Sequence, residues 1–143
     1  MAHHIAVFME NQPGKLEKIS AVLAANGINI MALSMANAGE FGVLKIMCGS
    51  PEKAFRVLKE NHFTVSLREI IIAEINDEPG GFHHLISLLS ENKINIEDCY
   101  GFVIENKKSA AIIFESAKYP EAETVLKKNK IKILKDEDFG IFQ

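Results

Sequence analysis

The sequence has 143 residues, of which 48% are hydrophobic and 24% are charged, and its formal net charge at pH 7 is −3. This composition is typical of a folded globular protein and excludes a disordered chain. The charges are scattered, so they favour no nucleic-acid partner, and no apolar run approaches the ~20 residues that span a bilayer. The first residues lack a secretory signal, so we expect a cytoplasmic protein without membrane or nucleic-acid partners.

The first half of the sequence predicts strand, helix, strand, strand, helix and strand. Residues 5–9 form an apolar run typical of a buried strand. After a Pro-Gly turn the apolar residues recur at helical spacing, as Leu16, Ile19, Val22 and Leu23. Residues 28–35 and 41–48 predict a hairpin, and a second helix carries Ala54, Val57 and Leu58.

The second half of the sequence repeats the first. Asn11-Gln12-Pro13-Gly14 corresponds to Asp77-Glu78-Pro79-Gly80 at a spacing of 66 residues, and Ile28-Asn29-Ile30 corresponds to Ile94-Asn95-Ile96 at the same spacing. Val57-Leu58-Lys59 matches Val125-Leu126-Lys127 at a spacing of 68 residues. In the second copy we expect strands over residues 70–75, 94–104 and 109–114, and a helix with the apolar residues Phe82, Leu85, Ile86 and Leu89.

The order βαββαβ favours an α+β fold of the ferredoxin-like type, with an antiparallel sheet covered on one face by two helices. We expect two tandem copies, one over residues 1–69 and the other over residues 70–143. Residues 64–75 leave almost no linker, so the copies should pack together. Residues 139–142 stand where a third copy would begin, and we expect them to add a strand to the first unit.

The two Pro-Gly turns are the candidate binding sites. A helix N-terminus attracts a carboxylate, and Gly at the first turn lets a ligand approach the backbone. The Asn11 or Asp77 side chain could cap the helix or reach a ligand ammonium group. The alternative is an ordinary capping turn without a ligand, because Asn or Asp near Pro-Gly also serves that purpose.

In combination these motifs resemble the ACT domain: N/D-x-P-G, a helix, Gly27-Ile28-Asn29-Ile30, and a hairpin containing Phe41-Gly42. The resemblance covers both repeats. It implies a ferredoxin-like fold, amino-acid ligands held at the interface between two units, pairing of units, and allosteric control without catalysis. It also implies that Asn11, Asp77, Asn29 and Asn95 hold the ligand. The whole candidate set is Asn11, Gln12, Pro13, Gly14, Leu16, Asn29, Ile30, Asp77, Glu78, Pro79, Gly80, Gly81, Phe82, Asn95 and Ile96.

Catalysis and metal binding have no support in the sequence. Nucleophile, phosphate-loop and zinc motifs are missing, as is the aromatic signature of RNA-binding sheets. Cys48 and Cys99 lack metal-ligand spacing, and His83 and His84 point ~100° apart on their helix, so we expect a solvated helix face there and no cofactor.

The sequence therefore predicts an amino-acid-binding regulatory protein that forms a homodimer and has a metabolic enzyme as a possible partner. A cationic ligand is favoured if Asp77, Glu78 and Glu97 converge. The alternative is a ligand-free adaptor that pairs with such an enzyme through its sheet edge or its helices.

Overall fold

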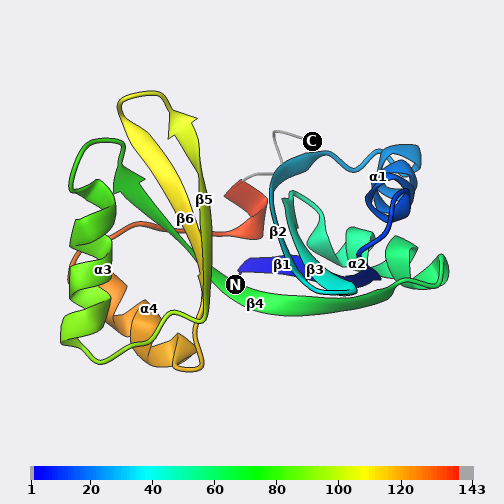
Figure 1. The fold of residues 1–143 in the computed structure, drawn as a ribbon. Helices are drawn as coiled ribbons and strands as arrows, with labels where there is room; N and C mark the ends of the chain where they lie inside the picture. The colour runs from blue at the N-terminus through cyan, green and yellow to red at the C-terminus, as the bar shows by residue number, and fades with distance from the viewer. Residues whose placement is uncertain (1, 139–143) are drawn as a thin grey trace. The chain divides into compact units, whose positions relative to one another are not determined.

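The computed structural model describes residues 2–138 and contains the predicted elements in the predicted order (Figure 1). The elements are β1 (Ala2–Glu10), α1 (Lys15–Ala25), β2 (Ile30–Ala38), β3 (Phe41–Cys48), α2 (Pro51–Glu60), β4 (Thr64–Asn76), α3 (Gly81–Glu91), β5 (Asp98–Glu105), β6 (Ser109–Glu115), α4 (Tyr119–Lys128) and β7 (Ile133–Leu134).

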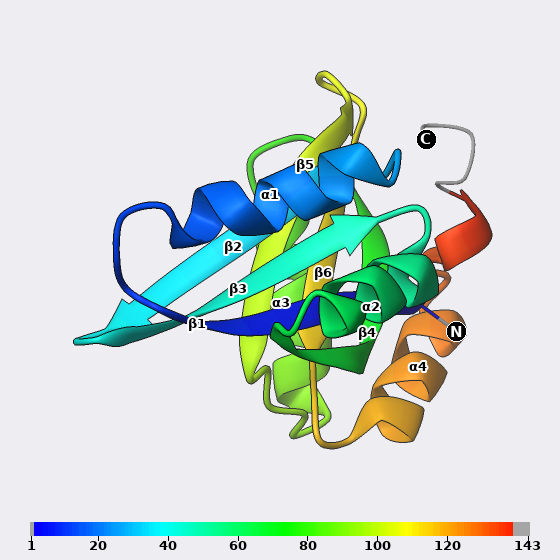
Figure 2. The ribbon, with the colours of Figure 1, turned by 90° about the vertical axis from the view of Figure 1, so that its right-hand side faces the viewer.

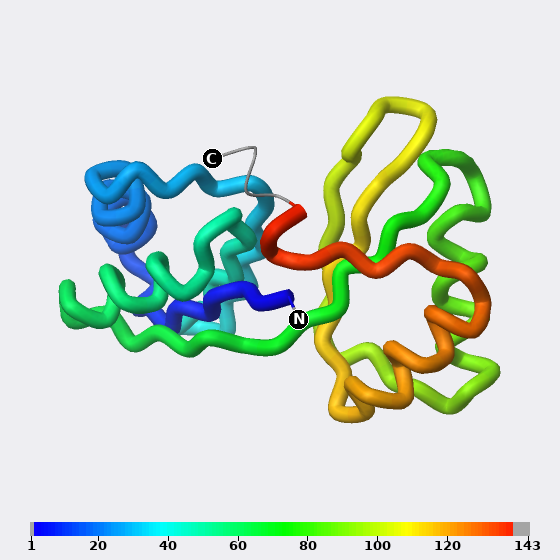
Figure 3. Tube along the Cα trace, turned by 180° about the vertical axis from the view of Figure 1, so that it is seen from behind, coloured from blue at the N-terminus to red at the C-terminus, as the bar shows by residue number. Residues whose placement is uncertain are grey.

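The chain divides into two compact units. We call His3–Arg68 with residues 136–138 the N-terminal unit, and Glu69–Lys135 with Ala2 the C-terminal unit. The division falls inside β4, which contributes its first residues to one unit and the rest to the other. Figure 3 traces the chain from β1, in blue, to residues 136–138, in red. The end of the described chain therefore belongs to the same unit as its first helix.

In the N-terminal unit the strand order is β2-β3-β1-β4. β3 pairs antiparallel with both neighbours, and Val7 of β1 lies opposite Leu44 of β3. α1 and α2 cover one face of this sheet (Figure 2). Alternate strand residues point into the core between sheet and helices, where they pack against Ile19 and Leu23 of α1 and Leu58 of α2.

The C-terminal unit repeats this arrangement, with the strand order β5-β6-β4-β7. β4 pairs antiparallel with β6, where Ile71 lies opposite Phe114, and with β7. The core joins these strands to Leu85 and Leu89 of α3 and Leu126 of α4. The prediction of two ferredoxin-like βαββαβ units with antiparallel sheets is confirmed.

The first residue of each predicted apolar stripe is an exception to helix burial. Leu16 is 41% exposed and Phe82 is 47% exposed, whereas Ile19 and Leu85, one turn later in each helix, are completely buried. The helical period was read correctly from the sequence, but the buried face covers only the later turns. The first turns of α1 and α3 therefore present large apolar side chains to the surface.

The strand predicted over residues 94–104 begins later than expected, since β5 starts at Asp98. The Ile94 N–H donates to the Leu89 carbonyl at 2.9 Å, and Ser116 Oγ donates to the Asn95 carbonyl at 2.9 Å. Residues 94–97 thus connect the helix end to the sheet. Ile94 is buried in the core, so the apolar alternation here reflects packing rather than strand pairing.

The cysteine and histidine side chains considered for metal or redox chemistry form no common site in the described residues. Cys48 and Cys99 are both free thiols, and burial raises the pKa of the Cys48 thiol to about 11. His83 and His84 are exposed on α3. Within residues 2–138, no group of three or more His, Cys, Asp or Glu side chains is placed to hold a metal ion. In the same part of the chain no helix is long and apolar enough to cross a membrane.

Residues 136–138 are fastened to the N-terminal unit by Asp136. Its carboxylate accepts a hydrogen bond from the His3 backbone N–H at 2.9 Å and contacts His3 Nδ1 at 3.1 Å. The strand predicted over residues 139–142 lies outside the described residues and stays a prediction. The described part of the chain end is nevertheless tied to the start of β1.

Replacing Asp136 should loosen this attachment. We expect Asp136→Ala to lower the free energy of unfolding by about 1 kcal/mol, because both contacts to His3 are lost. Glu137→Ala, at an exposed neighbouring position, is the matched control. Urea denaturation of both variants measures the difference, and equal stability of the two would contradict the assigned role of Asp136.

Candidate functional site

Both Pro-Gly turns have the same backbone conformation. Gly14 has φ 88° and ψ −13°, and Gly80 has φ 88° and ψ −11°, in the left-handed region that glycine tolerates best. Each glycine carbonyl accepts the first helical hydrogen bond, from Lys18 N at 3.1 Å and from His84 N at 2.9 Å. Neither helix start has a side-chain cap, so the suggestion that Asn11 or Asp77 caps its helix is wrong.

Asn11 and Asp77 instead hold each turn to the neighbouring hairpin. The Asp77 carboxylate accepts from the Lys107 backbone N–H at 2.7 Å, and the Asp77 N–H donates to the Lys108 carbonyl at 3.1 Å. In the N-terminal unit Asn11 Nδ2 donates to the Gly39 carbonyl at 3.1 Å, and Asn11 N donates to the Glu40 carbonyl at 2.7 Å. The two side chains thus hold the same turn with hydrogen bonds of opposite direction, an amide that donates in one unit and a carboxylate that accepts in the other.

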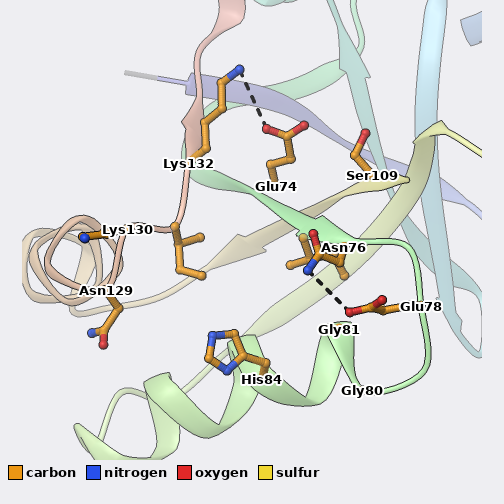
Figure 4. A pocket seen from close by; sticks show the side chains of 12 residues that line it. Glu74, Asn76, Glu78, Gly80, Gly81, His84, Ser109, Asn129, Lys130 and Lys132 are labelled. Atoms are coloured by element: carbon orange, nitrogen blue, oxygen red, sulfur yellow. Dashed lines mark hydrogen bonds and ion pairs between the residues drawn. The ribbon is translucent and has the colours of Figure 1, made fainter. Parts of the chain in front are cut away.

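Next to the second turn the C-terminal unit has a cavity of about 410 Å³, which we call the turn pocket (Figure 4). Its walls come from segments far apart in the sequence: residues 74–76 of β4, Glu78, Gly80 and Gly81, His84 of α3, Ser109, and residues 129–132 between α4 and β7. Its volume falls within the range of small-molecule sites.

The turn pocket contains charged groups of both signs. Lys132 Nζ lies 3.8 Å from Glu74 Oε2, and Asn76 Nδ2 donates weakly to Glu78 Oε1 at 3.5 Å (Figure 4). Lys130 and His84 add two further nitrogen-bearing side chains to the lining. Groups of opposite charge that are only loosely paired can each turn to a ligand, so the lining is complementary to a small zwitterion.

The N-terminal unit has a cavity of about 340 Å³ in the corresponding place, which we call the aromatic pocket. It is lined by Phe8, Met9, Glu10, Lys15, Phe41 and residues 62–64. These come from the end of β1, the start of α1, the start of β3, the loop before β4 and the first residue of β4, the same parts of the repeat that form most of the turn pocket. None of the turn residues 11–14 lines it.

The predicted residues of the second repeat fall into two places. Glu78, Gly80 and Gly81 line the turn pocket, whereas Asn95 and Ile96 line a separate cavity with Lys93. These two cavities lie at opposite ends of α3, whose 11 residues span ~16 Å. Within this unit Asn95 therefore does not join the turn, and the expectation of a ligand at an interface between units stays a prediction.

The other predicted residues line none of these three cavities. Pro79 and Phe82 are exposed, and neither lines the turn pocket. In the first repeat, Ile30 packs against the core. The other six candidates are exposed: Asn11, Gln12, Pro13, Gly14, Leu16 and Asn29.

Several residues that line the turn pocket were not predicted from the sequence. His84 was assigned to a solvated helix face, and residues 129–132 were not considered. A usable signal existed, because Asn129-Lys130 follows the last helix at the spacing of Asn61-His62 in the first repeat. The three acidic residues considered for a cationic ligand do not meet in this cavity, since only Glu78 of that set lines it.

Comparison with known proteins identifies the family. The profile described as "ACT domain pair" matches residues 1–142. The chain belongs to this family. ACT domain pairs are amino-acid-binding regulatory domains, as the motifs in both turns indicated. No curated protein matches the chain.

Several solved structures resemble this ACT pair in fold. A protein from Bacteroides thetaiotaomicron is 30% identical, with a TM-score of 0.90 over 97% of this chain and 95% of that one. The regulatory subunit of aspartate kinase from Thermus thermophilus is 18% identical, with a TM-score of 0.64 over 87% and 88% of the two chains. The corresponding subunit from Thermus flavus is also 18% identical, with a TM-score of 0.57 over 89% and 92%. The last two show the shared fold.

Gly81 fixes how closely α3 approaches β4, which sets the turn pocket. A Cβ at this position would overlap the Asn76 carbonyl oxygen, so the backbone would have to move. We expect Gly81→Ala to lower the free energy of unfolding by roughly 2 kcal/mol. Lys15→Ala is the matched control, because Lys15 stands at the equivalent position and already carries a side chain. Calorimetric melting of both variants tests this, and a fully stable Gly81→Ala protein would contradict the close approach.

Proposed function

We propose that this ACT pair binds a free amino acid in the turn pocket and acts as a regulatory protein without catalytic activity of its own. The observation that carries the proposal is the lining of the pocket, which combines carboxylates, amines and a helix start around one cavity. Every free amino acid presents an ammonium and a carboxylate close together. A site with loosely paired charges of both signs suits that pair better than it suits an anion or a cation alone.

The arrangement of the lining suggests an orientation for the ligand. Glu74 and Glu78 are the partners for the ammonium group, and Lys130 and Lys132 are the partners for the carboxylate. The ligand side chain would then face His84 and Asn129, which favours a small or polar amino acid.

The lining argues against the cationic ligand considered from the sequence. The Asp77 carboxylate is bonded to the Lys107 N–H, and Glu97 does not line the turn pocket. Two carboxylates and two amines remain, so the site offers no surplus of negative charge to a second ammonium group. A neutral amino acid is the ligand class that this balance supports.

Regulation would follow from the way the pocket is built. A ligand there contacts β4, α3 and the loop before β7, three segments that its binding would hold together. A ligand shifts an equilibrium only by its different affinities for the two states, and a site that needs three segments in place binds the ordered state best. The relatives named as regulatory subunits of aspartate kinase support a metabolic enzyme as the partner.

Ligand binding should stabilise the protein against heat. At about 100 times the dissociation constant, a selective amino acid should stabilise the folded chain by roughly 2.7 kcal/mol, which raises the melting temperature by several degrees. We expect Glu78→Gln to weaken binding about tenfold, because the ammonium loses a carboxylate partner. Glu17→Gln is the same change at an exposed position of α1 that does not line the pocket, and it should leave binding unchanged.

A thermal-shift screen of the twenty amino acids, followed by calorimetry on each hit, makes this measurement. A flat screen up to millimolar concentrations would reject amino-acid binding and leave the ligand-free adaptor as the function. A hit that Glu78→Gln does not weaken would keep the ligand class but move the site away from the turn pocket.

We also propose that the protein is a homodimer. β2 and β5 are the outermost strands of the two sheets, and each presents large exposed apolar side chains: Leu33 and Met35 on β2, and Val103 and Ile104 on β5. Exposed edges of this kind invite pairing with another chain. Sedimentation equilibrium at micromolar concentration should give twice the mass of one chain, and Leu33→Lys should shift the protein toward monomer. A monomeric wild-type protein would refute the proposal.

A further inference from the structure

The aromatic pocket of the N-terminal unit has a lining that the proposed function does not use. Phe8 and Phe41 stack at its rim, with ring centroids 5.4 Å apart and an angle of 20° between the ring planes. Both rings stay about half exposed, at 50% and 46%. Phe63 contributes a third aromatic side chain to the lining. Folding has gathered three aromatic residues around a cavity without covering two of them.

Charged groups of opposite sign stand beside these rings. Glu10 at the end of β1 and Lys15 at the start of α1 both line the aromatic pocket. Among residues 2–138 neither side chain makes an ion pair. The pocket therefore combines an uncompensated carboxylate, an uncompensated amine and an apolar aromatic surface. A small molecule that carries an ammonium group, a carboxylate and an apolar side chain would be complementary to this lining.

The repeat shows how the two cavities diverged. Phe8 stands where the C-terminal unit has Glu74, and Thr64 stands where it has Lys132. The ion pair in the lining of the turn pocket, between Lys132 and Glu74, is thus replaced by an aromatic ring and a small hydroxyl side chain. Two cavities with these different linings do not favour the same ligand, although they occupy the same place in their units.

We propose that the aromatic pocket is a second binding site, selective for a free amino acid with an aromatic or large aliphatic side chain. Its ammonium is held by Glu10, its carboxylate by Lys15, and its side chain covers Phe8 and Phe41. The inference rests on the proposed function as an amino-acid-binding protein, but it uses a different cavity. The chain then responds to two classes of amino acid, one for each repeat.

The test is isothermal titration calorimetry of the full chain with L-phenylalanine and L-leucine, with glycine as the small control ligand. Phenylalanine and leucine should bind with comparable constants and glycine at least tenfold more weakly. Phe41→Ala should weaken phenylalanine binding at least tenfold, because it removes half of the stacked pair. Phe82→Ala, the same change at another half-exposed phenylalanine that lies outside this cavity, should leave it unchanged.

Two further variants separate binding from folding. Phe41→Leu keeps the apolar bulk at the rim and should reduce phenylalanine affinity more than leucine affinity. Glu10→Gln keeps the size of the side chain and should weaken both ligands to a similar extent. If Phe41→Ala unfolds the N-terminal unit, the pattern across these two variants still decides the question.

The outcomes distinguish this inference from the proposed function. Binding of small polar amino acids that Glu78→Gln abolishes, together with no binding of phenylalanine or leucine, would overturn the second site and leave the first. Phenylalanine binding that depends on Glu78 and not on Phe41 would also overturn it. Phenylalanine binding that depends on Phe41 and Glu10, without any ligand for the turn pocket, would support the second site and reject the first.

Discussion

The hydrogen bonds between each Pro-Gly turn and its neighbouring hairpin are the constraint on which both cavities depend. Asp77 accepts from residue 107 with its carboxylate and donates to residue 108 with its backbone N–H, whereas Asn11 donates to residues 39 and 40 with its side-chain amide and its backbone N–H. These bonds fix where each strand ends, and the left-handed glycine that follows fixes where each helix begins. The space left between strand end, helix start and the last loop of each unit is then a consequence of that geometry.

The backbone accordingly sets the position of the cavities, and the side chains set their chemistry. The two turns differ by only 2° in ψ at Gly14 and Gly80, yet one cavity is lined by charges and the other by aromatic rings. Gly81 lets α3 approach the Asn76 carbonyl, whereas Lys15 at the equivalent position places an amine at its cavity. A duplicated framework can therefore change its ligand without changing its fold, since few cavity side chains take part in the core.

The fold was predictable from the sequence because its signals are local and occur twice. The spacing of Ile19 and Leu23, the Pro-Gly turns and the short apolar runs each predict one element, and the repeat confirms the order. The cavity linings were only partly predictable, since they combine segments that meet through tertiary packing. His84 looks like a solvated helix residue until the loop before β7 is placed beside it. The bond of Asp77 to its hairpin was not predictable, because its partner is a backbone group, which leaves no mark in the sequence.

Strand β4 contributes residues to both cavities. Residues 74–76 line the turn pocket, and Thr64 at the other end of the same strand lines the aromatic pocket. A ligand that orders one end of a hydrogen-bonded strand can change the order of the other end, and such coupling is the same in both directions. If the strand is already fully ordered, the two ligands add their stabilisation independently. If both cavities bind ligands as proposed, then the coupling between them depends on the order of β4 without ligand, more than on the affinity of either cavity.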